Sequence, residues 1–347
     1  DLNYFLLILG ILFVVFYDFT NGFHDAADMI ATAVASRAMT PGIAILIVTV
    51  FTFLGPFIGG LAVADTIGEF VKLGGATKEI AFSVIFAAIL AAISYNLITW
   101  KLGLPSSSSS SLVSGLIGAG ILALGNSNIH WGISELMDGK IEGFMKIVIG
   151  MFFSPLAGFI AGFILMKLFL FLFKRLSEKS KIFFIIAQYL TVSWLGFSHG
   201  TNDAQKGMGI IGMLLLAAGV NSSFMIPDWV VLLCASSITL GTMFGGWNII
   251  KTVGFGIYKV KLIHSIADQI GAATVILTSS LIGAPTSTTQ VVTTTLMGVG
   301  AGQRPKHVRW TMVKNIFSGW LMNIPSSMIL GAIYYYLFIQ LFTYLPE

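Results

Sequence analysis

Long apolar stretches recur along the whole chain, and they restrict the possible folds more than any other feature of the sequence. They cover residues 4–17, 41–63, 79–100, 112–124, 143–173, 182–197, 207–220, 229–250, 266–283 and 310–342. Only 10% of the 347 residues are charged, whereas a soluble domain carries about 25% charged residues. A surface so poor in charge is stable in lipid rather than in water. The sequence therefore predicts a multi-pass integral membrane protein of the cell membrane.

The apolar stretches are continuous, so they predict helices rather than the strands of a transmembrane barrel, in which apolar and polar residues alternate. A helix needs about 20 apolar residues to cross a bilayer, and several stretches are shorter. The shorter ones predict half-helices or re-entrant segments, whose polar backbone lies inside the protein. Residues 4–17 are expected to form the first membrane segment rather than a removable signal peptide. Broken helices of this kind are where transporters bind their substrates.

Three local patterns occur twice, in the same order and about 180 residues apart. The pairs are Gly22–Ala26 with Gly200–Ala204, Leu54-Gly55 with Leu240-Gly241, and Pro105–Ser109 with Pro285–Thr289. Matches that keep their order along the chain indicate a duplication. We therefore expect two homologous halves within one membrane domain, residues 1–173 and 182–347, joined by the polar linker 174–181.

The distribution of charge indicates how the two halves are oriented. Lys and Arg gather around four segments, Arg37, 174–181, 251–261 and 304–309. In residues 65–78 and 125–146 they are offset by Asp and Glu. Because positive residues concentrate on the cytoplasmic side, the first group, with the linker, is expected inside the cell and the second outside. The repeat pairs 65–78 with 251–264, so equivalent segments face opposite sides, which predicts an inverted repeat with both chain ends outside. The positive charge thus indicates topology, and no nucleic-acid partner is expected.

The first paired motif contains acids, in residues 21–28 and 199–203, and each copy is predicted to open a short apolar helix. A carboxylate at membrane depth costs about 3 kcal/mol, so Asp25 and Asp203 need partners. One interpretation is that each acid caps its helix. The other is a cation site, because the duplication places both acids near one symmetry axis, and Asn21 and Asn202 add neutral oxygens that suit a hard cation.

The second paired motif is a run of hydroxyl residues that follows a proline and precedes an apolar, glycine-containing segment. A serine run can be a flexible linker, but apolar residues on both sides disfavour that interpretation. A helix break after the proline would expose backbone N–H groups beside hydroxyl donors, which makes an anion cradle. The predicted anion-binding residues are Ser106, Ser107, Ser108, Ser109, Thr286, Ser287, Thr288 and Thr289.

Carboxylates and an anion cannot share a site of low dielectric unless positive charge lies between them. Two like unit charges 4 Å apart repel by about 4 kcal/mol at an effective dielectric of 20. The motifs supply one positive side chain, Lys206. We therefore expect bound cations to provide the missing charge, which predicts the joint transport of a cation and an anion.

At these motifs the chain resembles the inorganic phosphate transporters, the PiT family. The two family signatures match residues 21–28 and 198–206, and the paired family hairpins match Pro105–Ser109 and Pro285–Thr289. The resemblance covers nearly the whole chain. It implies phosphate as the transported anion, a cation carried with it, and a homodimer as a possible assembly.

The chain departs from the family pattern at three positions, and the departures favour sodium. The family usually has Asn where this chain has Asp28, and often has His where this chain has Ser110 and Gln290. Two titratable groups are thereby absent, although His24 and His199 keep proton coupling open. The expected sodium ligands are Asn21, Asp25, Asp28, Asn202, Asp203 and Gln269. No cofactor is expected besides the coupling sodium ions.

These features predict an all-α inverted-repeat transporter with broken helices and paired re-entrant hairpins. Its expected function is the import of inorganic phosphate with sodium by alternating access. One alternative is proton-coupled uptake of phosphate or of a metal–phosphate complex. An alternative from another class is an intramembrane hydrolase that uses a serine of residues 106–111 with His24 or His199. The duplication argues against an enzyme, because catalysis needs one nucleophile and one base, whereas alternating access needs two equivalent gates.

Overall fold

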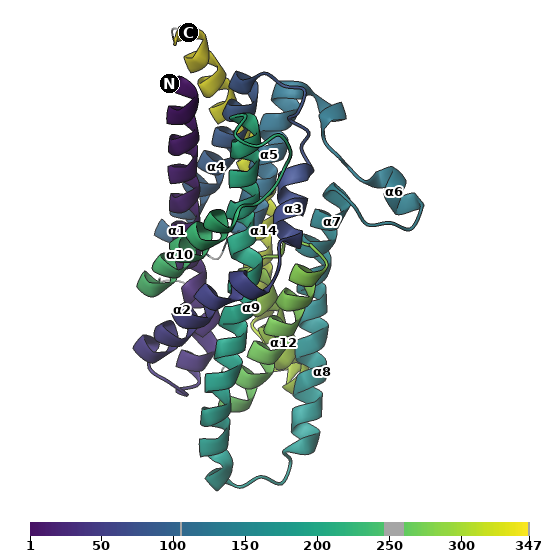
Figure 1. Cartoon of the computed structure of the whole chain (residues 1–347). Helices are drawn as coiled ribbons and strands as arrows, with labels where there is room; N and C mark the ends of the chain where they lie inside the picture. The colour runs from purple at the N-terminus through teal and green to yellow at the C-terminus, as the bar shows by residue number, and fades with distance from the viewer. Residues whose placement is uncertain (105, 246–259, 346–347) are drawn as a thin grey trace.

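The computed structural model describes residues 1–104, 106–245 and 260–345, and this part of the chain forms an elongated bundle of helices (Figure 1). The helices that build the bundle are α1 (Leu2–Ala35), α2 (Pro41–Ile58), α3 (Ala62–Glu69), α4 (Lys78–Lys101), α5 (Ser108–Leu124), α8 (Ser154–Leu172), α9 (Lys181–Ala217), α10 (Asp228–Phe244), α12 (Leu262–Leu281), α13 (Thr288–Gln303) and α14 (Trp310–Tyr344). Shorter helices connect them: η1 (Asn126–Asn128), α6 (Ile133–Met137), α7 (Phe144–Val148), η2 (Ile149–Phe153), η3 (Glu178–Ser180) and η5 (Pro305–His307).

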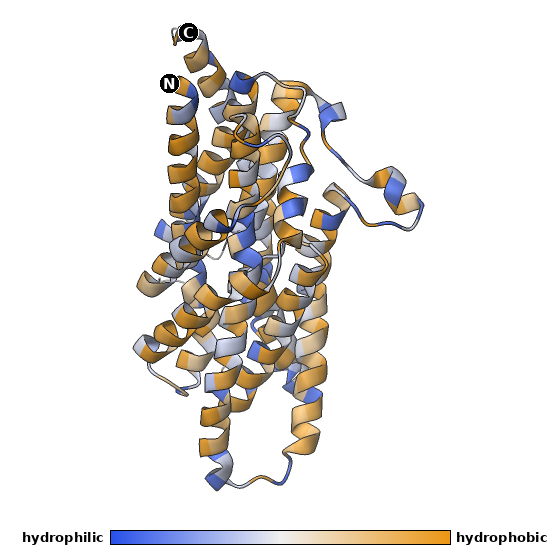
Figure 2. Cartoon of the chain, in the orientation of Figure 1, coloured by the Kyte–Doolittle hydropathy of each residue, from blue (hydrophilic) through white to orange (hydrophobic). Residues whose placement is uncertain are grey.

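Seven helical segments in the described residues are long and apolar enough to cross a membrane. They are α1, α2, α4, the continuous segment Phe144–Leu172, α9, α12 and α14. The long helices consist mainly of apolar residues, as Figure 2 shows, and many large apolar side chains are exposed, such as Phe171 at 77% and Leu190 at 74%. An apolar surface of this kind is stable in contact with lipid tails and unfavourable in contact with water. The chain is therefore a multi-pass, all-α membrane protein, as the sequence predicted.

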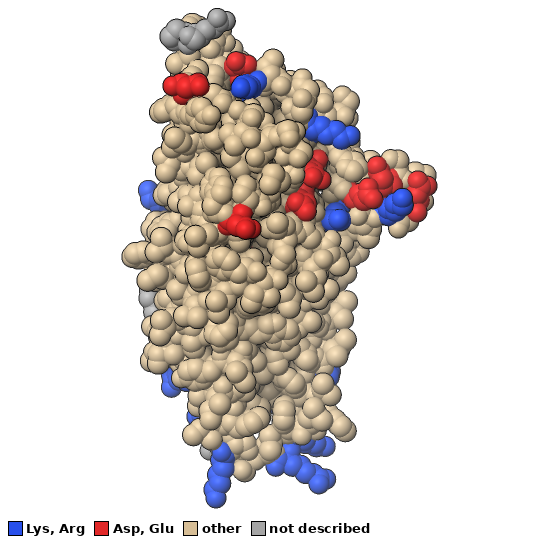
Figure 3. Space-filling view, viewed as in Figure 1, with Lys and Arg blue, Asp and Glu red and all other residues tan. Residues whose placement is uncertain are grey.

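Charged side chains gather toward the two ends of the bundle. On the face drawn in Figure 3, Asp and Glu lie in the half that holds both chain termini, together with some Lys or Arg, whereas the opposite end, where residues 174–181 join α8 to α9, shows Lys and Arg without Asp or Glu. Residues 70–72 pair with 128–130, with 2.7 Å from Lys72 N to the Asn128 carbonyl oxygen. The two segments predicted to be external therefore lie on one side. Most of residues 251–264, the predicted counterpart of 65–78, lies outside the described residues.

The acid motifs lie in the middle of two long helices, α1 with 34 residues and α9 with 37. The prediction that each motif opens a short helix is therefore wrong, and so is the prediction of half-helices at residues 4–17, 182–197 and 207–220. Neither helix contains a proline, so the backbone hydrogen bonds continue through the motif. Glycines in the motifs allow close packing: a Cβ at Gly22 or Gly200 would collide with a backbone carbonyl of α10 or α2.

The hydroxyl runs lie where helices begin, as the sequence predicted. Helices α4 and α12 each end before a glycine with positive φ, Gly103 at 68° and Gly283 at 81°, which is a common way to stop a helix. Helices α5 and α13 then begin, with Ser107 and Ser287 as their N-caps. The two helices have 17 and 16 residues, too few to span a bilayer alone. Pro105 lies outside the described residues, and re-entrant entry into the membrane stays a prediction.

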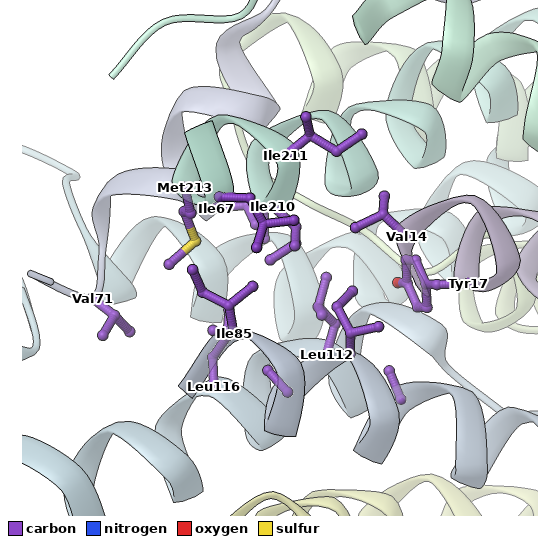
Figure 4. Packing of buried hydrophobic residues seen from close by; sticks show 14 of the residues in the cluster. Val14, Tyr17, Ile67, Val71, Ile85, Leu112, Leu116, Ile210, Ile211 and Met213 are labelled. Carbon is purple, nitrogen blue, oxygen red and sulfur yellow. The ribbon is translucent and has the colours of Figure 1, made fainter. Parts of the chain in front are cut away.

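Helices from the two predicted halves are interleaved in the bundle. From the first half, α1 packs against α9 and α10, α2 against α9, α5 against α14 and α8 against α13. The largest core cluster joins side chains of α1, α4, α5 and α9, among them Val14, Ile85, Leu112 and Ile211 (Figure 4). This packing buries the acid motifs and the hydroxyl runs inside the bundle.

Candidate ion and substrate site

The acid motifs of α1 and α9 meet the starts of α5 and α13 inside the bundle. All eight predicted anion-binding residues are buried: Ser106, Ser107, Ser108, Ser109, Thr286, Ser287, Thr288 and Thr289. The six predicted sodium ligands are buried as well: Asn21, Asp25, Asp28, Asn202, Asp203 and Gln269. Burial of polar groups is unfavourable unless they find partners, so their contacts indicate what the site can bind.

Each hydroxyl run is held to the motif of its own half by an equivalent contact. In the first half, Ser108 Oγ donates to Asn21 Oδ1 at 2.6 Å. In the second half, Thr288 Oγ1 lies 3.0 Å from His199 Nδ1. Asn21 and His199 occupy corresponding positions of the two motifs, and Ser108 and Thr288 occupy corresponding positions of the two runs. Matching contacts therefore fix both helix starts.

A second pair of equivalent contacts fixes the segment before each run. His24 Nε2 lies 3.4 Å from the carbonyl oxygen of Leu104. Asn202, at the corresponding position of the second motif, donates to the carbonyl of Ala284 at 3.3 Å and accepts from the backbone N–H of Thr286 at 3.1 Å. The first motif thus has Asn and then His at these two positions, and the second motif has His and then Asn. The segments that these side chains contact occupy corresponding positions in the two halves.

Two carboxylates of the first motif lie together beside the start of α13. Thr289 Oγ1 is 2.5 Å from Asp28 Oδ2 and 3.2 Å from Asp25 Oδ1. His24 Nδ1 is 3.4 Å from Asp25 Oδ1. The other oxygen of Asp28, Oδ1, has no hydrogen-bond partner among the described residues. Carboxylate and hydroxyl oxygens are ligands that a hard cation prefers, so this cluster has the donor set of a cation site.

The acid of the second motif has a different environment. Lys206, which follows on the same face of α9, forms an ion pair with Asp203 and donates a hydrogen bond to the carbonyl of Thr286 at 2.9 Å. His199 Nδ1 lies 3.0 Å from Asp203 Oδ2 and 4.0 Å from Asp25 Oδ2. The structure therefore brings the carboxylates of the two motifs to one place, with a histidine between them.

The two hydroxyl runs also touch each other. Ser109 Oγ donates to the carbonyl of Thr286 at 3.0 Å, and Thr286 Oγ1 is buried without a partner in the described part of the chain. The first turn of a helix leaves backbone N–H groups without intrahelical partners, and both helices place theirs beside these hydroxyls. Such an arrangement is suited to an anion. The site can thus hold an anion and a cation side by side.

Gln269 belongs to a separate polar cluster. Its Oε1 accepts from Thr191 Oγ1 at 2.5 Å, and its Nε2 lies 3.2 Å from both Thr32 Oγ1 and Gln188 Oε1. In the described residues, Gln269 forms no hydrogen bond with Asp25 or Asp203. Its predicted role as a sodium ligand stays a prediction.

A family model described as "Phosphate transporter family" matches residues 21–331, a range that contains both acid motifs and both hydroxyl runs. The chain belongs to the phosphate transporter family. The resemblance noted in the sequence is thereby confirmed. Because members of this family are transport proteins, the chain is a transport protein rather than an enzyme, and the hydrolase alternative is excluded.

Similar members of the phosphate transporter family match over almost their whole length. A probable low-affinity inorganic phosphate transporter of Bacillus subtilis (strain 168) is 40% identical over 345 residues, which cover 97% of this chain and 99% of the relative. A probable low-affinity inorganic phosphate transporter of Rhizobium meliloti (strain 1021) is 37% identical over 334 residues, which cover 95% of this chain and 96% of the relative. A solved structure described as "The sodium-dependent phosphate transporter" matches with a TM-score of 0.84 at 24% identity, over 98% of this chain and all of that one. This likeness shows a shared fold.

Two buried acids of this phosphate transporter family member were missed by the sequence analysis. Asp268 lies on α12 beside Thr32 of α1. Asp18 lies on α1, against Gly207 of α9. An acid inside or next to an apolar stretch is a candidate functional residue in any membrane protein, so the sequence contained the signal. The search for duplicated motifs passed over both acids because neither has an acidic counterpart in the other half.

Proposed function

We propose that this protein imports inorganic phosphate together with sodium by alternating access. The observation that carries the proposal is the meeting of the acid motifs with the hydroxyl runs, where Thr289 lies against both Asp25 and Asp28. Relatives named as low-affinity inorganic phosphate transporters support the choice of anion. A solved structure of the same fold, described as a sodium-dependent phosphate transporter, supports the choice of cation.

Phosphate is proposed to bind between the two helix starts, where the predicted residues of both runs offer O–H and N–H donors. Thr286 Oγ1 is free to donate, and it lies in the segment that Ser109 also contacts. Phosphate at neutral pH still carries a proton that it can donate, whereas sulfate does not. A motif carboxylate would accept a hydrogen bond from this phosphate O–H group and would disfavour sulfate.

Sodium is proposed to bind at the carboxylates of the first motif, next to the anion. Asp28 Oδ1 is buried and unpaired in the described structure, so a bound cation would satisfy it. Opposite unit charges 4 Å apart attract by about 4 kcal/mol at an effective dielectric of 20. Sodium should therefore raise the affinity for phosphate, and phosphate should raise the affinity for sodium by the same factor. The proposal includes no cofactor besides these coupling ions.

Alternating access is proposed to use the duplicated halves, residues 1–173 and 182–347, as an inverted repeat with hairpins α4–α5 and α12–α13. The matching contacts of Asn21 with Ser108 and of His199 with Thr288 support equivalent roles for the halves. Inverted halves can exchange conformations, which opens the site to each side in turn. A homodimer stays a prediction.

Cysteine labelling tests the inverted repeat. With the native Cys234 replaced, cysteines at Lys72 and Asn128 should react with impermeant thiol reagents from outside, and cysteines at Ser177 and Lys259 only from inside. Lys259 lies outside the described residues, but the labelling needs no structure there. Reaction of segments 65–78 and 251–264 from the same side would contradict the inverted repeat.

Coupling to protons is a second candidate function, because histidines contact both motif acids. His24 Nδ1 lies 3.4 Å from Asp25 Oδ1, and His199 Nδ1 lies 3.0 Å from Asp203 Oδ2. Histidine can change its charge near neutral pH. In this candidate function a proton on the histidine takes the place of sodium, and the transported species is phosphate or a metal–phosphate complex.

Uptake of radiolabelled phosphate into proteoliposomes separates the two candidates. An inward sodium gradient at equal pH should drive accumulation above the level reached without a gradient. A proton gradient in sodium-free buffer should not. Protein-free liposomes and a sodium ionophore serve as controls. Accumulation driven by the proton gradient alone would replace sodium by protons in the proposal.

A further inference from the structure

The two acid motifs carry opposite charges at one pair of corresponding positions. In each motif the acid is followed three residues later by a second charged residue, Asp28 after Asp25 and Lys206 after Asp203. Residues three apart lie on one face of a helix, and both motifs are helical throughout. The first half therefore presents two negative charges at its motif, and the second presents one negative and one positive charge.

Lys206 is enclosed by the site. Its side chain is completely buried, it forms an ion pair with Asp203, and it lies 2.9 Å from the carbonyl oxygen of Thr286, in the segment leading into α13. A carboxylate and a backbone carbonyl beside a buried single positive charge are the surroundings of a bound monovalent cation. The ammonium group of lysine is a compact point charge, so it can serve in such surroundings.

In the described residues, the corresponding place in the first half has no lysine or arginine, and the basic side chains beside Asp25 are His24 and His199. Asp28 Oδ2 lies 2.5 Å from Thr289 Oγ1, Asp28 Oδ1 is unpaired in the described residues, and Asp25 lies 3.2 Å from the same hydroxyl. Two carboxylates this close repel each other unless a cation joins them. Among the residues described, the first motif thus has two carboxylates without a lysine beside them, whereas in the second motif Lys206 balances the charge of Asp203.

We propose that the Lys206 ammonium is a tethered cation that replaces one transported cation. In this proposal, which rests on the proposed function, the pair Asp25 and Asp28 binds an exchangeable coupling cation, while the site at Asp203 is permanently filled by Lys206. A tethered charge stays with the protein when the site opens to the cytoplasm. Each cycle then carries one cation fewer than a transporter with a free cation at both motifs would carry.

Counting bound sodium tests the proposal. Purified protein is equilibrated with radiolabelled sodium and radiolabelled phosphate, and the number of sodium ions bound per phosphate is counted. The slope of the logarithm of phosphate affinity against the logarithm of sodium concentration gives a second measure of this number. Lys206→Met removes the charge and keeps an unbranched side chain of similar length. It should bind one more sodium ion per phosphate than the wild type, with a slope higher by about one. Lys206→Arg keeps the charge and should keep the wild-type count.

A reciprocal variant and a charge-balanced variant cover the case in which Lys206→Met does not fold. Asp28→Lys gives the first motif the charges of the second, and it should bind one sodium ion fewer than the wild type. The double variant Asp203→Asn with Lys206→Met removes both charges of the pair, and it should keep the wild-type count. Equal counts in the wild type, Lys206→Met and Asp28→Lys would overturn the proposal.

Failure of the sodium coupling proposed above can be distinguished from failure of the tethered cation. If the wild type binds phosphate without any sodium, the sodium coupling is wrong. A sodium dependence acquired by Lys206→Met alone would then still support the tethered cation, because the variant would need a free ion where the wild type has its own. No sodium dependence in either protein would overturn both.

Discussion

The acid motifs and the hydroxyl runs are both polar segments in a membrane interior, but they lie at different places along their helices. The acid motifs lie inside α1 and α9, where backbone groups are bonded within the helix and only side chains are available. The hydroxyl runs lie at the starts of α5 and α13, where the first-turn N–H groups that the Ser107 and Ser287 caps do not take lack partners within the helix. The helix interior thus supplies fixed charge, and the helix start supplies hydrogen-bond donors.

This difference suits the two regions to different ligands. A cation needs oxygens with negative charge, which side chains such as Asp25 and Asp28 supply without breaking the helix. An anion needs several N–H and O–H donors that converge on one point, which a helix start supplies at little cost. Contacts such as that between Thr289 and the two acids place the regions side by side. The following substitutions test this comparison, beginning with the one that has the largest expected effect.

Asp203→Asn is expected to have the largest effect, and the effect should be on stability. It leaves the buried Lys206 ammonium without its carboxylate, and breaking a buried ion pair by removing one partner costs about 3–5 kcal/mol. Thermal unfolding in detergent should show a lower Tm. The double variant with Lys206→Met should recover most of the loss. If Asp203→Asn has the same Tm as the wild type, the ion pair does not contribute to stability.

Asp25→Asn should abolish the effect of sodium on phosphate binding. The substitution removes a charge and nearly keeps the shape, so folding should survive while the coupling of about 1–3 kcal/mol, or 5- to 150-fold in affinity, is lost. Phosphate binding with and without sodium measures this coupling. Asp228→Asn, an exposed acid at the start of α10, is the matched control and should keep it. Sodium dependence that survives in Asp25→Asn would place the cation elsewhere.

Thr286→Ala should weaken phosphate binding without changing the sodium dependence. Its hydroxyl has no partner in the described protein, so its loss affects mainly the bound anion, by about 1.5–3 kcal/mol, or roughly ten- to a hundredfold. Thr293→Ala removes another buried, unpartnered hydroxyl from the interior of α13 and should have little effect on binding. Thr286 is a cleaner test than Ser107, which also caps α5. Wild-type affinity of Thr286→Ala would remove this residue from the anion site.

Gly200→Ala should lower stability by a smaller amount, about 1–3 kcal/mol, because a Cβ there collides with the backbone of Thr52 on α2. The close approach of α9 to α2 holds the second motif in place. Gly319→Ala on α14 is the matched control, since a Cβ there meets no atom within 4 Å. The Tm of the control should equal or slightly exceed that of the wild type. An unchanged Tm for Gly200→Ala would show that the helices can separate without loss.

Local sequence predicted the starts of the helices better than their continuity. Ser107 and Ser287 act as N-caps through their own side chains, three residues from the N–H groups they accept, and a cap is a local interaction that sequence shows directly. The interruption expected at Asn21 and His199 is absent, because polar side chains in a helix find partners on other helices. Those partners, Ser108 and Thr288, lie about 90 residues away.

The sequence by itself determined the membrane class, the all-α fold and the paired motifs, and it predicted the residues of the candidate site, because hydrophobic run length and repeated motifs are properties of the chain alone. Only the tertiary structure decided how these residues combine. It placed Thr289 of the second half on Asp25 and Asp28 of the first, and it gave Gln269 partners in a separate cluster. Such contacts join segments distant in sequence, and they depend on how closely whole helices pack, which no local pattern specifies.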